Sequence, residues 1–504
     1  MKPDPAERIL RRLPSGFREW LYRRARRSRR LAVRLDRKYE EMLDGLGEGL
    51  PASTEAVAAR LPSTGLPAQE VLARLEALLG EPERRVEDGY ASGAVYHGGR
   101  EHVDLLNRAY STHAQSNPMH ADLWPGTVRM EAEIVAMTAR MLNGPKAVGT
   151  VTSGGTESIL LAMKAYRDQA RQDRGIGRPE MVLPVTAHAA FLKAAEYFGI
   201  EPVLVPVDSG CAADPQAMAN AITRRTAVVV GSAPSFPHGT IDPIPQLAAA
   251  AARAGVGMHV DACLGGFLLP WAERLGHEIP PFDFRVEGVT SMSADTHKYG
   301  YAAKGTSVIL YRERSLRRHQ YFTASDWPGG LYASPTLAGS RPGGLSAACW
   351  AAMMSTGEQG YLDATASILE TAARVRRGIE SMPGVRLLGN PLWVIAFTCD
   401  DADVYRVQEE MTRRGWSLNG LQRPPAVHLA VTLRHTEPGV AERFLEDLEA
   451  AVAAAGAAER DPDASVPMYG VAASFPVRAA VDDLLEHYLD RLYDLPDRQE
   501  GEPA

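Results

Sequence analysis

The strongest constraint on the fold is an alternation of short apolar runs and amphipathic segments that begins near residue 130. Helical periodicity recurs between the apolar runs, which lie at 148–151, 181–185, 202–206, 227–231 and 257–261. Strands separated by helical crossovers run parallel, and the helices cover both faces of the sheet that the strands form. The alternation therefore predicts an α/β protein with a doubly wound, mainly parallel sheet.

Composition changes along the chain and predicts four parts. A basic helical segment occupies 1–60, and a proline-rich linker at 61–67 opens an arm with polar loops that extends over 61–130. The alternation of strands and helices fills a large domain at 131–378. Shorter apolar runs and amphipathic helices over 379–504 predict a small α+β C-terminal domain.

The basic segment contains six arginines between residues 23 and 30. An approximate helical stripe of apolar residues follows, at Leu31, Val33, Leu35, Tyr39, Met42 and Leu43. A basic amphipathic helix is typical of a contact with an anionic membrane. The thin apolar face favours the other interpretation, a solvated helix that packs along a partner subunit.

Composition also argues against several classes of protein. A net charge of −7 over 504 residues argues against a nucleic-acid-binding protein. The four cysteines lack CxxC spacing, which indicates a reducing compartment with no disulfide framework and no metal site; they are Cys211, Cys263, Cys349 and Cys399. No signal peptide or membrane span is recognisable, so we expect a soluble, cytoplasmic protein.

A lysine follows the apolar run at 289–292, within the stretch Ser-Ala-Asp-Thr-His-Lys-Tyr-Gly at 293–300. Open α/β sheets bind their ligands at such strand ends. A lysine held in a pocket can lose its proton more easily and attack an aldehyde as a neutral amine. Lys298 is therefore a candidate nucleophile, and the alternative is a surface lysine in a loop.

Two further strand ends carry groups suited to a cofactor. One strand runs into a glycine-rich turn, Thr-Ser-Gly-Gly-Thr-Glu-Ser at 152–158, and then into a helix. Backbone N–H groups and the helix dipole make such a turn a phosphate site, although a helix start with Thr156 as its N-cap explains the same residues. Asp261 ends another buried strand, where a carboxylate is costly unless it is paired. A pyridinium N–H would pair it.

Three segments outside the alternation are predicted to be loops with a function. Two are polar segments at 92–96 and 115–120, which present Tyr96, Asn117 and His120. The third is a glycine- and proline-rich stretch at 327–344, which fits no regular element. Taken singly, each polar segment is also explained by an ordinary turn.

In this order, the stretches resemble the group II decarboxylase-like branch of the fold-type I enzymes that use pyridoxal 5'-phosphate (PLP). Within that branch the chain is similar to the sphingosine-1-phosphate lyase family, from about Leu61 to Leu492. The similarity rests on the stretches at 92–96, 152–158, 259–266, 293–301, 332–336 and 339–344. Two features depart from the family. A basic segment stands in place of the membrane span of eukaryotic members, as in a bacterial, soluble form, and Ala303 replaces a usual Pro.

The resemblance implies that PLP is the cofactor. Lys298 would bind its aldehyde covalently, Asp261 would keep its pyridine nitrogen protonated, and His188 would stack on its ring. The resemblance also implies a homodimer in which the neighbouring subunit contributes one of the residues that hold the cofactor phosphate. These residues are Gly155, Thr156, His297 and, from the neighbour, Ser340.

The resemblance further implies a lyase that cleaves the C2–C3 bond of phosphorylated long-chain sphingoid bases by retro-aldol chemistry. The products would be a fatty aldehyde and ethanolamine phosphate. The substrate phosphate would bind Tyr96, His120 and Lys304, with Asn117 beside them. The general base stays open among Lys298, a nearby Tyr or His, and the cofactor phosphate.

Two other hypotheses remain from the sequence. The first is an amino-acid decarboxylase on the same scaffold, and the presence of a distant phosphate-binding set argues for the lyase instead. The second is a catalytically inactive scaffold or lipid-binding protein. The intact pair of Lys298 and Asp261 argues against it.

Overall fold

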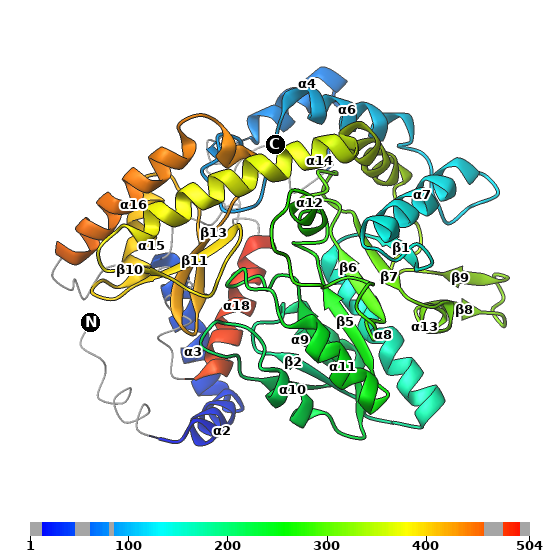
Figure 1. The fold of residues 1–504 in the computed structure, drawn as a ribbon, viewed down its shortest axis with the longest axis horizontal. Coiled ribbons are helices and arrows are strands. Elements are labelled where there is room, and N and C mark those ends of the chain that lie inside the picture. Colours follow the sequence, from blue (N-terminus) through cyan, green and yellow to red (C-terminus); the bar gives the residue numbers. More distant parts are fainter. Residues whose placement is uncertain (1–12, 46–60, 80–84, 458–476, 494–504) are drawn as a thin grey trace.

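The structure is a computed structural model, and it describes residues 13–45, 61–79, 85–457 and 477–493. Its centre is a seven-stranded sheet with the strand order β1-β7-β6-β5-β4-β2-β3 (Figure 1). The strands are β1 Val148–Thr152, β2 Glu180–Pro184, β3 Glu201–Val205, β4 Thr226–Ser232, β5 Gly257–Asp261, β6 Ser291–Ala294 and β7 Ser307–Tyr311. The predicted strands of the large domain are therefore all present.

Strand direction confirms the prediction of a mainly parallel sheet. Strands β2 to β6 pair in parallel with their neighbours. Strand β7 runs antiparallel to both β1 and β6. A short connection from β6 to an adjacent antiparallel strand leaves room for a tight turn, and Lys298 lies in that turn.

Helices cover both faces of this sheet, because side chains of successive strand residues point to opposite faces. Met181 and Leu183 of β2 join a core with α8 Gly155–Arg174, α9 Ala190–Phe198 and α13 Arg314–Arg318. Val182 joins the larger core on the opposite face. The helices there are α7 Pro125–Met141, α10 Pro215–Ala221, α11 Ile244–Ala254 and α12 Leu269–Arg274.

A smaller antiparallel sheet follows in the chain, with the strand order β10-β11-β13-β12. Its strands are β10 Val385–Leu387, β11 Val394–Cys399, β12 Asn419–Gln422 and β13 Pro425–Ala430. Helices α15 Val404–Arg413 and α16 Val440–Ala457 cover it, and a 3-10 turn, Leu433–Thr436, follows β13. This arrangement confirms the predicted small α+β unit, although the sequence did not indicate β12.

One long helix, α14 Gly343–Glu380, runs from the large sheet to the small one (Figure 1). The sequence predicts two helices here, at 345–355 and 361–379. The structure has the break between them at Gly357, whose φ of 58° and ψ of 177° lie outside the helical region. Glycine adopts this conformation at little cost, so the two halves meet at an angle.

The N-terminal helices α2 Ser15–Arg26 and α3 Arg29–Gly45 pack against α18 Arg478–Tyr493. Tyr39 and Leu43 are buried against Leu484 of α18. The predicted apolar stripe is therefore only partly correct, because Leu31 and Val33 are 44% and 55% exposed. The proline-rich linker predicted at 61–67 contains no helix or strand, and residues 46–60 before it lie outside the described residues.

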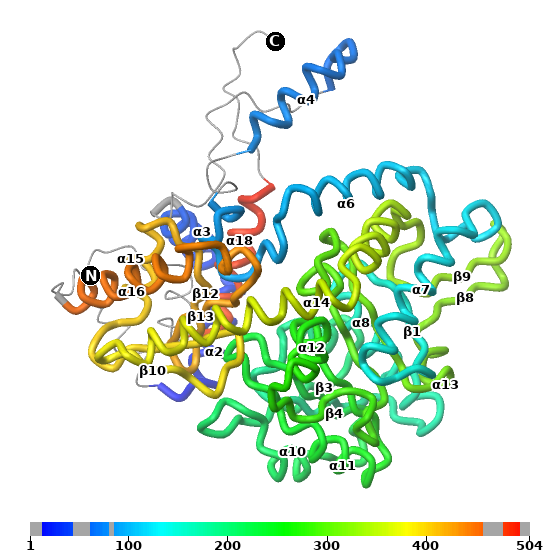
Figure 2. The backbone as a smooth tube through the Cα atoms, turned by 45° about the horizontal axis from the view of Figure 1, so that its top comes forward, coloured from blue at the N-terminus to red at the C-terminus, as the bar shows by residue number. Residues whose placement is uncertain are grey.

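Helix α4 Ala68–Ala77 stands away from the body of the molecule (Figure 2), whereas α6 Arg100–Thr112 packs against α14. The apolar side chains of α4 and of the two residues after it are all exposed, at Val71, Leu72, Leu75, Leu78 and Leu79. None of the described helices combines the length and the apolarity that crossing a bilayer requires.

The glycine-rich stretch that was expected to lack regular structure contains one strand of a short antiparallel hairpin, β8 Phe322–Ala324 and β9 Tyr332–Ser334. The prediction failed because each strand has only three residues, and Phe322 is exposed rather than part of an apolar pattern. The hairpin projects from the edge of the large domain (Figure 1). The remainder, up to Pro342, is an irregular loop.

Candidate active site

Lys298 lies in the turn between β6 and β7, which several hydrogen bonds hold in shape. Thr296 Oγ1 donates to Thr306 Oγ1 over 2.8 Å, and the Ala302 N–H donates to the Thr296 carbonyl over 3.0 Å. Tyr301 has a φ of 58°, which is unfavourable for a residue with a side chain. The turn is therefore fixed by its surroundings, and Lys298 does not lie on an open surface loop.

The amine of Lys298 forms an ion pair with a carboxylate that sequence reasoning missed. Lys298 Nζ lies 2.9 Å from Asp295 Oδ2, and the Asp295 side chain is only 2% exposed. Burial alone would lower the pKa of Lys298, but the Asp295 carboxylate, together with Cys263 and Tyr96, outweighs burial and raises it. Burial would raise the pKa of Asp295, but Lys298 and His297 together lower it. The expectation that Lys298 loses its proton more easily is therefore wrong for the protein by itself.

Asp295 could have been found from its position in the sequence. It directly follows β6, just as Asp261 ends the neighbouring strand β5, so both carboxylates lie at the same edge of the sheet. Asp295 Oδ1 is buried and has no hydrogen-bond partner among the described residues. An unpaired oxygen of a buried carboxylate is costly, so Asp295 is a candidate site residue.

The glycine-rich turn begins helix α8 as predicted, but the proposed cap is wrong. The N-cap position belongs to Gly154, at φ 155° and ψ 170°, and no side chain caps the helix. Thr156 lies inside the first turn, where its side chain is exposed. The first backbone N–H groups of α8 are therefore not occupied by a capping side chain, which leaves them available to an anion.

Gly155 is required by its contact with the lysine turn. A Cβ atom at this position would lie 2.7 Å from both carboxylate oxygens of Asp295 and 2.8 Å from Cys263 Sγ. His297 lies beside the same turn, with its Nε2 atom 3.9 Å from Asp295 Oδ2. Burial lowers the pKa of His297, and Asp295 opposes this effect. The turn, His297 and Lys298 thus lie together at one end of the sheet.

Asp261 is 7% exposed at the end of β5 and belongs to a buried polar chain. Its Oδ1 accepts hydrogen bonds from the Cys263 N–H over 3.0 Å and from Ser293 Oγ over 3.2 Å. Ser293 Oγ also lies 3.3 Å from His259 Nε2. Burial lowers the pKa of His259 to about 4, so this histidine is neutral at pH 7. No cation pairs with Asp261 among the described residues.

His188 precedes helix α9, and its own backbone fixes the ring. Its Nδ1 accepts a hydrogen bond from the Ala190 N–H over 3.1 Å. The ring meets Phe236 edge to face, with a centroid distance of 6.1 Å. Because Nδ1 accepts, the neutral tautomer carries its proton on Nε2.

Tyr96 and Lys304 come together beside Lys298, as the sequence predicts. Lys304 Nζ lies 4.6 Å from the centre of the Tyr96 ring, and Tyr96 meets Tyr299 edge to face at 4.9 Å. Burial raises the pKa of Tyr96 despite the opposing effect of Lys298. Desolvation and the nearby Lys298 ammonium lower the pKa of Lys304 to about 8.

The small sheet positions Tyr96. The Gly93 N–H donates to the Ala430 carbonyl over 3.0 Å, and the Leu433 N–H donates to the Tyr96 carbonyl over 3.2 Å. Ser92 Oγ accepts from the Ala430 N–H over 2.9 Å. The polar segment at 92–96 is therefore an ordered connection tied to β13.

Asn117, His120 and Ser340 form a second group within this chain. Asn117 Oδ1 accepts hydrogen bonds from the N–H groups of Met119 and Arg341, over 3.1 and 3.2 Å. Ser340, next to Arg341, is exposed, and so is His120, which contacts the Trp124 ring. No interaction among the described residues joins this group to Tyr96 or Lys304. The structure therefore brings only part of the predicted substrate set together within one chain.

Comparison with known proteins agrees with this arrangement. Residues 73–387 match the model of the pyridoxal-dependent decarboxylase conserved domain. Sphingosine-1-phosphate lyase from Dictyostelium discoideum is 47% identical over 437 residues, which cover 86% of this chain and 82% of that protein. The chain belongs to the sphingosine-1-phosphate lyase family. Membership confirms the resemblance described from the sequence motifs.

Solved structures place the lyase family within a wider fold. Burkholderia pseudomallei sphingosine-1-phosphate lyase superposes with a TM-score of 0.82 at 44% identity, covering 88% of this chain and 99% of that one. Lactobacillus brevis glutamate decarboxylase gives a TM-score of 0.69 at 21% identity, covering 80% and 96%. At this identity the decarboxylase shows the shared fold alone. The family and the fold together make PLP the cofactor.

Three features of the site fit PLP. The uncapped start of α8 offers N–H donors to a phosphate group. Asp261 offers a buried carboxylate with no cationic partner among the described residues, which suits a pyridinium N–H. Lys298 offers the primary amine between these two groups.

Proposed function

We propose that the protein is a PLP-dependent lyase that cleaves the C2–C3 bond of phosphorylated long-chain sphingoid bases such as sphingosine 1-phosphate. The products are a fatty aldehyde and ethanolamine phosphate. The observation that carries the proposal is the pair of Tyr96 and Lys304 beside Lys298. Tyr96 and Lys304 supply a hydroxyl donor and a cation in addition to the groups assigned to the cofactor phosphate, which suits a substrate that carries its own phosphate.

We assign the cofactor contacts as follows. Lys298 holds the cofactor covalently, and Asp261 keeps the pyridine nitrogen protonated because a buried carboxylate needs a partner. Bound PLP supplies an electron sink for the bond that breaks. His188 covers one face of the ring. The phosphate of the cofactor binds Gly155, Thr156, His297 and Ser340.

Asp295 controls the charge of Lys298. The ion pair holds Lys298 as an ammonium in the protein by itself. Attack on an aldehyde requires the neutral amine, and the raised pKa of Lys298 and the lowered pKa of Asp295 make loss of the ammonium proton unfavourable while the ion pair persists. His297 lies too far from Asp295 for a hydrogen bond, but the Asp295 carboxylate still opposes the lowering of the His297 pKa by burial.

We assign the substrate phosphate to Tyr96, Lys304 and His120, with Asn117 beside it. Tyr96 is a hydroxyl donor in an apolar environment, and Lys304 is a point charge at the entrance to the lysine turn. Partial neutralisation of Lys304 above pH 8 predicts that phosphate binding weakens there.

We also propose that the site is shared between two chains of a homodimer. Asn117 is hydrogen-bonded to the residue after Ser340, so the loops that carry them move as one unit. If Ser340 reaches the neighbour's cofactor, Asn117 and His120 reach the neighbour's substrate with it. The five exposed apolar residues of the α4 segment support an extensive contact between chains. Light scattering on the active enzyme tests this proposal, and an active monomer contradicts it.

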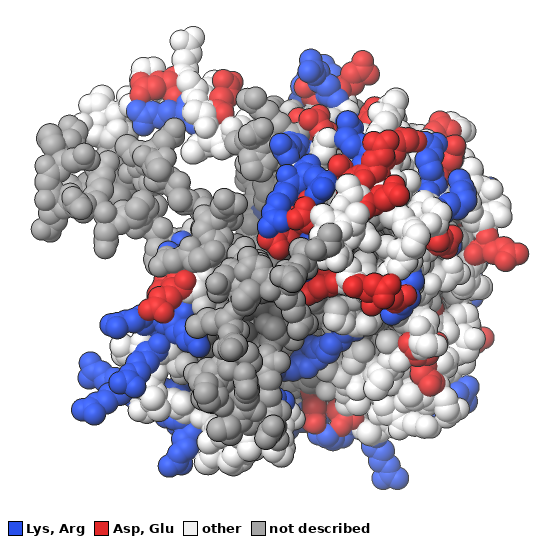
Figure 3. All heavy atoms as spheres, turned by 90° about the vertical axis from the view of Figure 1, so that its left-hand side faces the viewer, with Lys and Arg blue, Asp and Glu red and all other residues white. Residues whose placement is uncertain are grey.

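We propose a peripheral contact between α2–α3 and an anionic membrane. Residues 14–45 hold ten Lys or Arg against five Asp or Glu, whereas the whole chain has a net charge of −7. Phe17 and Trp20 stack at 5.6 Å and are 47% and 52% exposed. Lys and Arg side chains project from the lower part of the face in Figure 3. Exposed aromatic rings beside arginines are typical of membrane interfaces.

Sedimentation with vesicles tests the membrane contact. Vesicles that contain phosphatidylglycerol should bind the protein, and phosphatidylcholine vesicles should not. Replacement of Phe17 and Trp20 by alanine should weaken binding. The proposal is contradicted if the wild type and the Phe17→Ala, Trp20→Ala variant bind equally to both vesicle types.

We further propose a cytoplasmic location, which the four unpaired thiols support. We also propose a division of the chain into four parts at residues 60, 130 and 378, which the two separate sheets support.

The lyase reaction is tested by incubation of the PLP-loaded protein with sphingosine 1-phosphate. We expect a long-chain aldehyde and ethanolamine phosphate in equal amounts, and neither product from Lys298→Ala. Unphosphorylated sphingosine is the matched substrate control and should react poorly. Release of carbon dioxide from amino acids without cleavage of the phosphorylated base would instead identify a decarboxylase. Failure to retain PLP would identify an inactive scaffold.

A further inference from the structure

A cavity of about 600 Å³ lies between α7, α12 and α14, and neither Lys298 nor Asp295 lines it. We call it the methionine cavity, and its apolar lining includes Met137, Met141, Phe267, Trp271, Met353 and Tyr361. Its volume is within the range of small-molecule sites. The residues assigned to the cofactor and to the substrate phosphate do not line it.

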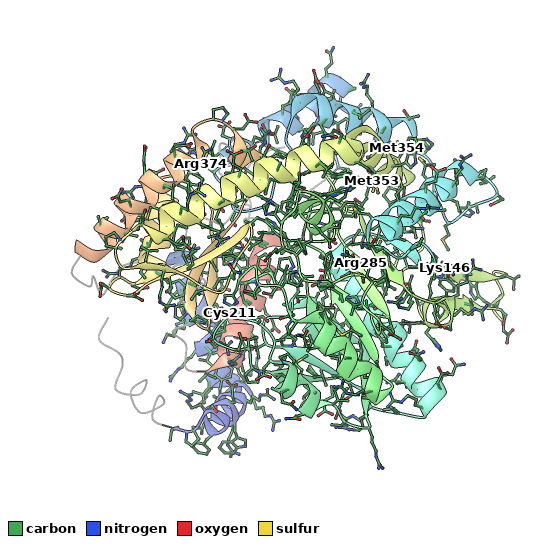
Figure 4. All side chains as sticks on the ribbon, in the orientation of Figure 1. Lys146, Cys211, Arg285, Met353, Met354 and Arg374 are labelled. Carbon is green, nitrogen blue, oxygen red and sulfur yellow. The ribbon has the colours of Figure 1, made fainter. Side chains whose placement is uncertain are left out.

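The break in α14 helps to form the methionine cavity. Gly357 lines it, and the helix turns away there because Gly357 has a non-helical conformation. Met353 and Met354 project from the half of α14 before the break, above Arg285 in the view of Figure 4. Methionine side chains are flexible and polarizable, so they adapt to apolar ligands of varying shape.

The rim of the methionine cavity is charged, and one of its charges has no partner. Arg285 forms a two-point ion pair with Glu273 at 2.8 Å, and Arg274 pairs with Glu358 at 2.9 Å. The side chain of Arg140 has neither a hydrogen bond nor an ion pair among the described residues. The two paired arginines are neutralised locally, which leaves Arg140 as the free cation of an otherwise apolar site.

The back wall of the methionine cavity contacts the lysine turn. Trp271 and Tyr361 stack face to face, with centroids 5.4 Å apart and planes within 5°. Tyr361 stacks in turn on Tyr301, and its hydroxyl donates to the Gly300 carbonyl over 3.0 Å. Gly300 lies two residues after Lys298. A ligand that packs against Trp271 and Tyr361 therefore contacts a residue that is hydrogen-bonded to the lysine turn.

We propose that the methionine cavity is a second binding site, for a single-chain amphiphile with an anionic head group. The chain lies over the methionines and the Trp271–Tyr361 stack, and the head group pairs with Arg140. Binding changes the lyase rate through the hydrogen bond between Tyr361 and Gly300. The binding part of this proposal is independent of the proposed function, and the rate effect rests on it.

Calorimetric titration of the PLP-loaded protein with dodecanoate tests the binding. We expect saturable binding of dodecanoate and weaker binding of dodecylamine, which has the opposite charge. Arg140→Gln should weaken dodecanoate binding by about two- to fivefold, because Arg140 is exposed and an exposed ion pair contributes up to about 1 kcal/mol. Arg171→Gln removes an exposed arginine of α8 that is distant from the cavity lining, and it should leave the affinity unchanged.

A second pair of variants distinguishes the methionine cavity from the reaction site. Met354 is 54% exposed at the mouth, so Met354→Trp can be accommodated without disturbing the core, and it should block binding. Lys304→Ala should leave dodecanoate binding intact. The proposal is overturned if the wild-type enzyme fails to bind dodecanoate, if Arg140→Gln and Met354→Trp both bind as the wild type does, or if Lys304→Ala abolishes binding.

The rate effect has its own test. Saturating dodecanoate should change kcat on sphingosine 1-phosphate by about two- to tenfold, the range expected when one hydrogen bond is altered. Tyr361→Phe keeps the ring stack but lacks the hydroxyl, so this variant should bind dodecanoate and show no change in kcat. An unchanged kcat in the wild type, or an equal change in Tyr361→Phe, contradicts the coupling. Activity without dodecanoate is the test of the lyase itself, so the two failures are distinguishable.

Discussion

Asp295→Asn should destabilise the cofactor-free protein strongly. At the 2.9 Å between Lys298 Nζ and Asp295 Oδ2, two unit charges attract by about 6 kcal/mol at an effective dielectric constant of 20. Desolvation of both groups offsets part of this attraction. Removal of one partner from a buried ion pair costs about 3–5 kcal/mol, and we expect a loss of that size in the free energy of unfolding at pH 7.

The loss should depend on pH in a definite way. The pKa of Lys298 is raised by folding, so its stabilising contribution is complete below the unfolded pKa of about 10 and disappears as the pH rises through the folded value. The pKa of Asp295 is lowered, so its contribution is complete above about pH 4 and disappears as the pH falls. The difference between wild type and variant should therefore be constant from about pH 5 to 9 and shrink outside this window.

Urea unfolding of the cofactor-free proteins measures the effect. A double variant, Asp295→Asn with Lys298→Met, should recover part of the lost stability because no unpaired charge stays buried. Glu70→Gln removes one partner of the exposed ion pair between Glu70 and Arg74 and should leave the unfolding midpoint where it is. If Asp295→Asn unfolds at the wild-type midpoint, or if the double variant is the less stable of the two, the buried ion pair does not exist as described.

Three further predictions concern the reaction. Asp261→Asn should keep the fold and the cofactor but lower kcat by orders of magnitude, because the pyridine nitrogen loses its counter-ion; a near wild-type kcat in a steady-state assay contradicts the assigned role. Lys304→Ala and His120→Ala should each lower kcat/KM for the phosphorylated base by about ten- to a hundredfold, with PLP occupancy unchanged by absorbance, and loss of PLP would move that residue to the cofactor. For the wild type, kcat/KM should decline as the pH rises through about 8, where Lys304 loses its charge, and Lys304→Arg should move the decline to higher pH.

Much of the large sheet could be predicted because its strands are buried on both faces. A run such as Val228, Val229 and Val230 is almost wholly inaccessible to solvent, and continuous apolar runs of this kind are typical of parallel strands. The break at Gly357 was predictable from another local feature, because a glycine interrupts the helical pattern there. Short elements such as β8, which is largely exposed, and β12, which is half-buried, carry no comparable pattern.

Site residues that directly follow a strand could be predicted from the sequence. Contacts between particular side chains could not. Lys298, Asp261 and the turn at Gly155 each follow a recognisable strand, so their meeting at one sheet edge follows from the parallel topology. The pairing of Lys298 with Asp295 was missed because the sequence does not indicate which carboxylate faces the amine. The separation of His120 from Lys304 within one chain also depends on tertiary contacts that no local pattern records.

The attachment of Tyr96 to the small sheet has a mechanical consequence. The segment that carries Tyr96 is hydrogen-bonded to the small sheet through Gly93 and Ala430, and the Tyr96 carbonyl accepts from the Leu433 N–H, whereas Lys304 belongs to the connection between β6 and β7 of the large sheet. A phosphate held between these two side chains would contact one residue attached to the small sheet and one attached to the large sheet. Binding of a phosphorylated substrate should therefore add a contact between the two sheets, and release of a phosphorylated product should remove it.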